Sequence, residues 1–143
     1  MINFFSKLEE QAIINAIRAA ELNTSGEIRV HLEDKLSGSV LDVAVEVFKE
    51  LKMDETQARN GVLILLAPIE KQFAIIGDEG IDAVVPANFW DEEKNLMQGF
   101  FKEGAFCKGI CAAIEQIGEK LKAHFPYQDD DVNELPDEIS YGR

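Results

Sequence analysis

A continuous run of apolar residues, from Val62 to Ala67, limits what this chain can fold into more than any other feature. The run is far shorter than the roughly 20 residues of a membrane-spanning helix. It has the length of a strand, and a strand without polar residues is buried on both faces of its sheet. Such a strand requires a layer of structure above the sheet and another below it. The run therefore predicts a sheet sandwiched between helices.

The flanking segments supply those helices and two further strands. Apolar residues recur at helical spacing over residues 7–22, 40–52, 91–103 and 108–125, and a short helix is expected over 81–85. Residues 27–33 alternate, with Glu27, Arg29 and His31 on the polar face, and residues 72–76 follow a turn of hairpin length. This order predicts one α/β domain over residues 1–127, a three-layer α/β/α sandwich with a small mixed β-sheet flanked by helices.

Acidic residues outnumber basic ones in this chain. It contains 27 Asp and Glu against 14 Lys and Arg, which is a net charge of −13. This charge excludes nucleic acid as an obligate partner and disfavours anionic membranes, because both are polyanions. Divalent cations and basic protein partners remain compatible with it. The N-terminal segment lacks the features of a secretion signal and no apolar run is long enough for membrane insertion, so we expect a cytoplasmic monomer.

The last sixteen residues, 128–143, differ in composition from the rest of the chain. They hold six acidic residues and one arginine, and we expect an acidic tail that is flexible or loosely docked. Asp129, Asp131 and Asn133 match the first three ligand positions of an EF-hand loop, but Glu134 stands where the loop requires glycine. We therefore interpret this segment as a solvated tail rather than as an EF-hand.

Polar loops are expected to meet at one edge of the sheet. The connection over residues 34–60 contains a helix, and such a crossover joins parallel strands, so the loops before both strands lie at the same edge. The hairpin then returns the segment 77–82 to that edge. Together the three loops carry hydroxyl, carboxamide and carboxylate oxygens, which belong to Ser25, Glu27, Asn60, Asp78, Glu79 and Asp82.

Oxygen donors of this kind indicate a site for a hard divalent cation. Ca²⁺ is the first choice because it accepts six to eight oxygens in irregular loops, and Mg²⁺ is the second. The same residue types also form turns and helix caps without any ligand. Arg59 is in addition placed to form a structural ion pair with Glu27 or Asp78. The residues alone leave these interpretations open.

Three segments of the chain resemble the signature blocks of the TPM domain family. They are Thr24–Val30, Arg59–Ile64 and Gly77–Ile81, and the similarity extends over about residues 4–126, including Phe89-Trp90 and the segment 99–106. The resemblance implies an α/β/α sandwich and, for some members, calcium bound by loops at the strand edge. Carried onto this chain, it points to Ser25, Glu27, Asn60, Asp78 and Glu79, with Asp82 as a further position. It also implies a weak acid phosphatase activity for plant-type members.

Three functions follow from these observations as hypotheses. The first is a calcium-binding domain with the cation at the loop edge. The second is a weak metal-dependent acid phosphatase, in which Arg59 beside Asp78 would stabilise the transferring phosphoryl group. The third is a protein-interaction module whose acidic tail engages a basic partner. No catalytic residue is assigned from the sequence.

Overall fold

One crossover and one hairpin build the centre of the sheet. In the computed structural model, which describes residues 4–128 and 134–142, β1 (Glu27–Leu32) pairs in parallel with β2 (Gly61–Ala67). The next strand, β3 (Gln72–Gly77), pairs antiparallel with β2. Both relations agree with the sequence prediction, and every residue of β2 is buried. The long apolar run is therefore an interior strand covered on both faces.

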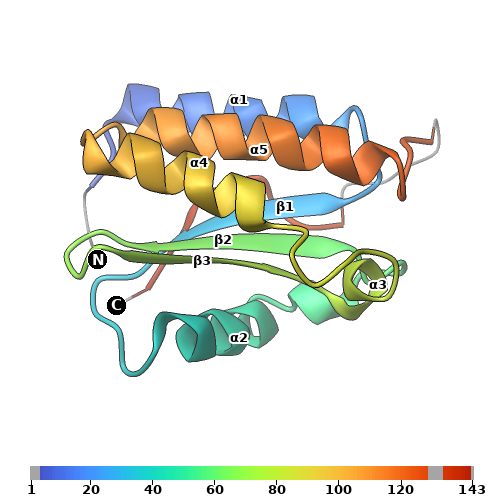
Figure 1. Cartoon of the computed structure of the whole chain (residues 1–143), viewed down its shortest axis with the longest axis horizontal. Coiled ribbons are helices and arrows are strands. Elements are labelled where there is room, and N and C mark those ends of the chain that lie inside the picture. The colour runs from blue at the N-terminus through green and yellow to red at the C-terminus, as the bar shows by residue number, and fades with distance from the viewer. Residues whose placement is uncertain (1–3, 129–133, 143) are drawn as a thin grey trace.

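Helices cover both faces of this sheet and complete the predicted α/β/α sandwich (Figure 1). One layer consists of α1 (Lys7–Glu21), α4 (Asp91–Lys102) and α5 (Phe106–Lys122), whereas α2 (Val40–Glu50) lies on the opposite face, followed by the short 3₁₀-helix η1 (Met53–Glu55). The one-turn helix α3 (Glu79–Asp82) stands at the end of the sheet. Within the described ranges, no helix combines the length and the apolar character needed to cross a membrane.

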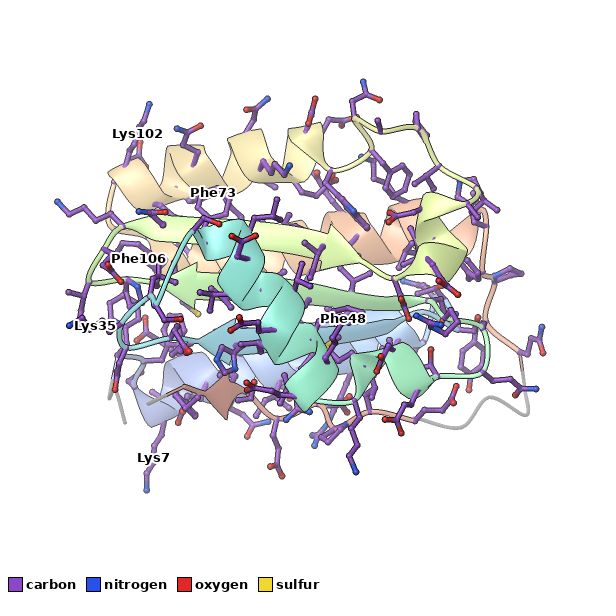
Figure 2. All side chains as sticks on the ribbon, turned by 90° about the horizontal axis from the view of Figure 1, so that it is seen from below. Lys7, Lys35, Phe48, Phe73, Lys102 and Phe106 are labelled. Atoms are coloured by element: carbon purple, nitrogen blue, oxygen red, sulfur yellow. The ribbon has the colours of Figure 1, made fainter. Side chains whose placement is uncertain are left out.

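The alternation of side chains along β2 divides the interior into two cores. Val62 and Ile64 belong to the larger core beneath α1, α4 and α5, and Leu63 and Leu65 belong to the smaller core under α2. Phe48 of α2 is part of the smaller core, and Figure 2 shows the helix lying across the sheet on this side. Successive side chains of a strand point to opposite faces, so an unbroken apolar run is what two cores require.

The C-terminal segment differs from the expected loose tail. Residues 134–142 run alongside β1, and β4 (Ser140–Tyr141) pairs in parallel with β1, which gives the strand order β3-β2-β1-β4. Leu135 and Ile139 are only 7% and 8% exposed. Burial of these two apolar side chains favours docking of the segment. The acidic composition of residues 128–143 as a whole gave no sign of this. The EF-hand-like residues Asp129, Asp131 and Asn133 lie outside the described residues.

This packing also changes the polar face of β1. Glu27 and His31 belong to the predicted polar face of the strand, and yet they are only 3% and 4% exposed. The Nδ1 atom of His31 lies 2.7 Å from the Oγ atom of Ser140, so the C-terminal segment contacts this face directly. Burial of two titratable groups is therefore a consequence of where the end of the chain returns.

Candidate functional site

The three predicted loops do meet at one edge of the sheet. The backbone N–H of Glu27 donates to the carbonyl of Asn60 at 3.2 Å, and the N–H of Asp78 donates to the carbonyl of Gly61 at 2.9 Å. These hydrogen bonds connect the starts of β1 and β2 with the end of β3. The topological prediction is therefore correct, and the six predicted ligand residues lie in these loops or in the ends of β1 and α3 that adjoin them.

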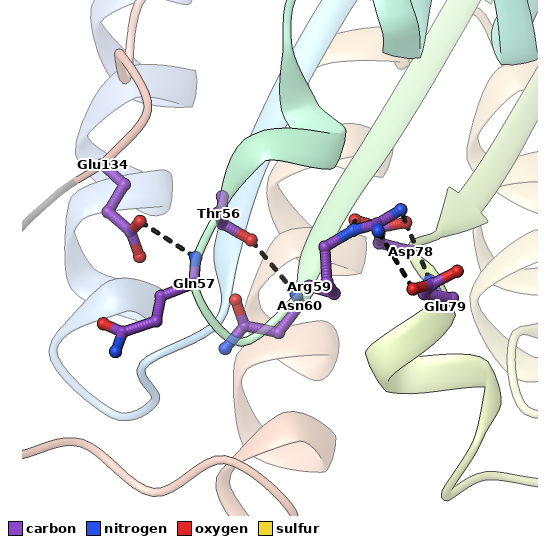
Figure 3. A network of polar contacts seen from close by, with 7 residues as sticks. All are labelled: Thr56, Gln57, Arg59, Asn60, Asp78, Glu79 and Glu134. Atoms are coloured by element: carbon purple, nitrogen blue, oxygen red, sulfur yellow. Dashed lines mark hydrogen bonds and ion pairs between the residues drawn. The ribbon is translucent and has the colours of Figure 1, made fainter.

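Arg59 occupies one half of this edge (Figure 3). Its Nε and second terminal nitrogen donate to the two carboxylate oxygens of Asp78 at 2.7 and 2.9 Å, and its first terminal nitrogen donates to Glu79 Oε1 at 2.9 Å. The carboxylate hydrogen bond raises the pKa of the Arg59 guanidinium. Asp78 also accepts the backbone N–H of Glu79 and so caps α3. The structural ion pair, one of the alternatives from the sequence, is formed here with Asp78.

Gly80 allows the start of α3 to approach the turn at Ala58 and Arg59 closely. Its N–H donates to the carbonyl of Arg59 at 2.9 Å. A Cβ atom at this position would lie 2.3 Å from the carbonyl oxygen of Ala58 and 2.5 Å from that of Arg59. Both are backbone atoms of a turn in which Arg59 adopts a φ of 51°. The glycine is therefore required by the close approach of two backbones.

Asp82 completes this half at the rim of a groove between α2 and α3. The groove has a volume of about 320 Å³, and Arg59, Asp78 and Glu79 line it together with Asp82. Partial burial, followed by the nearby charge of Asp78, raises the pKa of Asp82. The carboxylates of this half thus surround a guanidinium that already balances part of their charge.

The other half of the edge contains Glu27. Its Oε1 atom accepts the backbone N–H groups of Glu134 and Leu135 at 2.7 and 2.9 Å. Burial raises the pKa of Glu27 to about 7, and the charges of Glu134 and Asp137 add to the effect, although the two backbone hydrogen bonds act against it. The C-terminal segment therefore both binds this carboxyl group and surrounds it with like charge.

Glu21, at the end of α1, is a neighbour that the sequence did not indicate. Its Oε2 atom accepts the N–H of Ile28 at 3.0 Å. Burial and a hydrogen bond with Asp137 raise its pKa to about 9, with further repulsion from Glu27. We call Glu21, Glu27, Glu134 and Asp137 the β1 carboxylate cluster. No local pattern reveals it, because the C-terminal segment supplies two of its four members.

Ser25 and Asn60 lie beside this half of the edge. Asn60 is 1% exposed, and its Nδ2 atom is 3.5 Å from Ser25 Oγ. Its Oδ1 atom is buried and has no hydrogen-bond partner among the described residues. A buried carbonyl oxygen without a partner is unfavourable in water-free surroundings. It is a neutral oxygen donor of the kind that Ca²⁺ accepts.

The six predicted ligands thus form two groups rather than one preformed centre. Ser25, Glu27 and Asn60 lie at the starts of β1 and β2, and Asp78, Glu79 and Asp82 lie around Arg59. Across residues 4–128 and 134–142, no group of three or more His, Cys, Asp or Glu side chains has the arrangement of a metal site. The donors are all oxygens and fit a hard divalent cation by type, but side chains must move to enclose one.

Known structures share this fold. The chain is similar over 99% of its length to the BA42 protein from the psychrophilic bacterium Bizionia argentinensis, with 49% identity, 98% coverage of that chain and a TM-score of 0.93. It also resembles the N-terminal domain of a P. gingivalis protein (15% identity, TM-score 0.71, 86% of this chain and 80% of that one). A third is the N-terminal domain of cg2496 from Corynebacterium glutamicum (15% identity, TM-score 0.66, 94% of this chain and 79% of that one). The last two similarities concern the fold alone.

A family model described as the TPM domain matches residues 2–120. No curated protein matches the chain. The matched region contains all six predicted ligand positions and ends before the C-terminal segment that carries Glu134 and Asp137. The sequence blocks, the sandwich fold and this match agree, and the chain belongs to the TPM domain family.

Proposed function

We propose that the protein is a divalent-cation-binding domain, with Ca²⁺ as the preferred ion, and that the site includes Glu27 with Ser25 and Asn60 beside it. Glu21 of the β1 carboxylate cluster joins this donor set. The observation that carries the proposal is the gathering of the four carboxyl groups of this cluster, of which Asp137 pairs with Arg18 at 3.4 Å. Calcium accepts carboxylate, hydroxyl and carboxamide oxygens in irregular loops, which is the donor chemistry present here.

The carboxyl groups of Glu21 and Glu27 need a positive partner that the described residues do not supply. Neither has a lysine or arginine ion-pair partner among them. The raised pKa values, about 9 for Glu21 and about 7 for Glu27, mean that at pH 7 Glu21 is mostly protonated and Glu27 is about half protonated. A divalent cation relieves the same repulsion more completely, because it neutralises two carboxylates at once.

The second group of predicted ligands, Asp78, Glu79 and Asp82, is less suited to bind the cation. Both carboxylate oxygens of Asp78 already accept hydrogen bonds from Arg59, and Glu79 binds the same guanidinium. A cation there would have to displace Arg59 and place two positive charges close together. We therefore narrow the proposed site from six predicted residues to Ser25, Glu27 and Asn60, with Glu21 added.

Cation binding at Glu27 is linked to the C-terminal segment. The same carboxyl oxygen that accepts the N–H groups of Glu134 and Leu135 belongs to the proposed donor set. An ion bound by Glu27 must either share the carboxylate through its second oxygen or release these two N–H groups. Either way, Ca²⁺ changes how firmly residues 134–142 are held, which gives the site a regulatory use.

Calorimetric titration of the metal-free full chain with Ca²⁺ and with Mg²⁺ tests the proposal. Wild type is expected to release or absorb heat with Ca²⁺, Glu27→Gln is expected to lose at least tenfold in affinity, and Asp78→Asn is expected to bind as wild type does. Asn caps helices as well as Asp, so the second variant is a matched control that retains the α3 cap. Loss of binding in Asp78→Asn alone would move the site to the Arg59 group, and the absence of heat at millimolar Ca²⁺ would refute cation binding.

No specific observation favours either alternative function, the acid phosphatase or the protein-interaction module. The guanidinium of Arg59, which a phosphatase mechanism would direct at a phosphoryl group, is directed at Asp78 and Glu79 instead. A partner-binding role for the acidic tail needs a revised test, because residues 134–142 are part of the folded structure. Their deletion would disturb the sheet edge, so loss of a partner after deletion would not identify a binding surface.

A further inference from the structure

A second concentration of carboxylates lines the groove between α4 and α5, which run side by side in Figure 1. The groove has a volume of about 400 Å³. Four glutamates and one lysine line it, namely Glu92, Glu93, Glu115, Glu119 and Lys120, which is a net charge of 1 − 4 = −3. Its remaining lining includes Leu96, Phe100 and Ala112. The groove therefore combines an acidic rim with an apolar wall.

The groove already holds one ammonium group, that of Lys120. Its Nζ atom lies 2.9 Å from Glu93 Oε1 and donates to the carbonyl of Phe89. It also stands 4.6 Å from the centre of the Phe89 ring, within the range of a cation–π interaction. Glu92 lies at its outer side, 3.8 Å away. The local surroundings are thus suited to an alkyl chain that ends in an ammonium group.

Lys120 pairs with only one of the two carboxyl oxygens of Glu93. The residue is 0% exposed, and its Oε2 atom is buried with no hydrogen-bond partner among the described residues. A buried carboxylate oxygen without a donor is costly, and Lys120 can satisfy only the oxygen that it faces. Glu93 is one of the residues that line the groove, and its Oε2 atom is closed off from water, so a donor must move rim side chains aside to approach it.

We propose that the α4–α5 groove binds a primary alkylammonium group, carried by a linear polyamine or by a lysine side chain. The ammonium donates to Glu93 Oε2, and the methylene chain lies against Leu96, Phe100 and Ala112. Glu115 and Glu119 are four residues apart on α5, roughly 6 Å along the helix axis. They are placed to receive a second ammonium group of the same ligand. An inorganic cation makes no use of the apolar wall.

Titration of the full chain with spermidine, followed through backbone amide resonances, tests this inference. The informative variant is Glu115→Gln with Glu119→Gln, since both side chains are exposed on α5. We expect shifts confined to α4 and α5 and an affinity at least tenfold weaker in this double variant. The matched control, Glu46→Gln with Glu50→Gln, removes the same charge from exposed positions four apart on α2 and is expected to bind within twofold of wild type.

Two further arms identify the source of the ammonium group. A short peptide with one lysine, compared with its acetyllysine form, reports binding of a protein side chain, whereas spermidine reports binding of a free polyamine. Binding of either ligand to the groove supports the proposal. It is overturned if neither binds, if both double variants weaken binding equally, or if the shifts map to residues 21–27. The last result would instead place the amine at the β1 carboxylate cluster.

Discussion

Replacing Glu27 with glutamine tests the electrostatic account of the sheet edge. Glutamine keeps an oxygen that accepts the N–H groups of Glu134 and Leu135 but carries no charge. In the wild type, the pKa of Glu27 rises from an ordinary value of 4.5 to about 7 on folding, with burial as the main cause. Between these pH values the folded protein retains a proton that the unfolded chain has lost. The free energy of unfolding therefore falls as the pH rises through this window, and the loss is complete above pH 7.

The size of the effect follows from the same two pKa values. One pKa unit corresponds to about 1.4 kcal/mol, so the ionised carboxyl group destabilises the folded protein by up to roughly 3 kcal/mol above pH 7. For a chain of this length the entropy of unfolding is about 0.3 kcal/mol/K, and the same difference amounts to about 10 °C in the melting temperature. Glu27 is 3% exposed, so solvent screening reduces this value little.

Urea unfolding of wild type and Glu27→Gln in metal-free buffer at pH 4.5 and pH 8 measures this difference. We expect equal stability at pH 4.5 and a more stable variant at pH 8. The control variant Glu46→Gln, at an exposed position of α2, should behave as wild type at both pH values. Millimolar Ca²⁺ should stabilise wild type and leave the variant unchanged, which links the assay to the proposed site. A variant that is less stable than wild type at pH 8 without metal would show that the charge strengthens the hydrogen bonds more than burial penalises it, and the reasoning would fail.

Three further predictions concern the packing around this edge. Gly80→Ala places a Cβ atom 2.3 Å from the carbonyl oxygen of Ala58, and we expect about 3 kcal/mol of destabilisation in urea unfolding; a loss below 0.5 kcal/mol would contradict the required close approach. Ile139→Ala should reduce stability by about 2 kcal/mol, whereas a loosely attached C-terminal segment would leave unfolding unchanged. Burial lowers the pKa of His31 below 6.5, so its protonation opposes folding and stability falls as the pH decreases from 6.5. Because His31 contacts Ser140, the protection factors of the β4 amides, which correct for the pH dependence of intrinsic hydrogen exchange, should fall over the same pH range. Unchanged protection factors would separate the histidine from this strand.

Local patterns were sufficient for the long helices and for β1, β2 and β3 with their connections, but not for β4 at the end of the chain. The capping box at Ser6 and Glu9 marks the start of α1, and the apolar run of β2 marks the interior strand. Short elements were predicted less well: α3 begins at Glu79 rather than at Ile81, because Asp78 caps it directly after β3. Such a short helix has almost no periodicity to detect, so its start depends on a single hydrogen bond.

The candidate site divides in a similar way between what the sequence could and could not predict. The meeting of the three loops followed from strand direction alone, and the pairing of Arg59 with Asp78 was one of the alternatives that the residues left open. The β1 carboxylate cluster was not predictable. Glu21 ends a helix and Glu27 begins a strand, and neither position signals that acidic residues from the end of the chain lie next to it.

The sequence by itself determined the sandwich, the parallel pairing of β1 with β2, the antiparallel pairing of β2 with β3, and the edge at which polar loops gather. These features follow from side-chain periodicity and strand direction, which act between near neighbours in the chain. Only the tertiary structure decided which carboxyl groups lose contact with water. The hydrogen bond from Glu134 to Glu27 spans 107 residues, and it depends on where Leu135 and Ile139 find apolar surface to cover. Burial sets the charge state of a carboxyl group, so the chemistry of this edge follows from long-range packing.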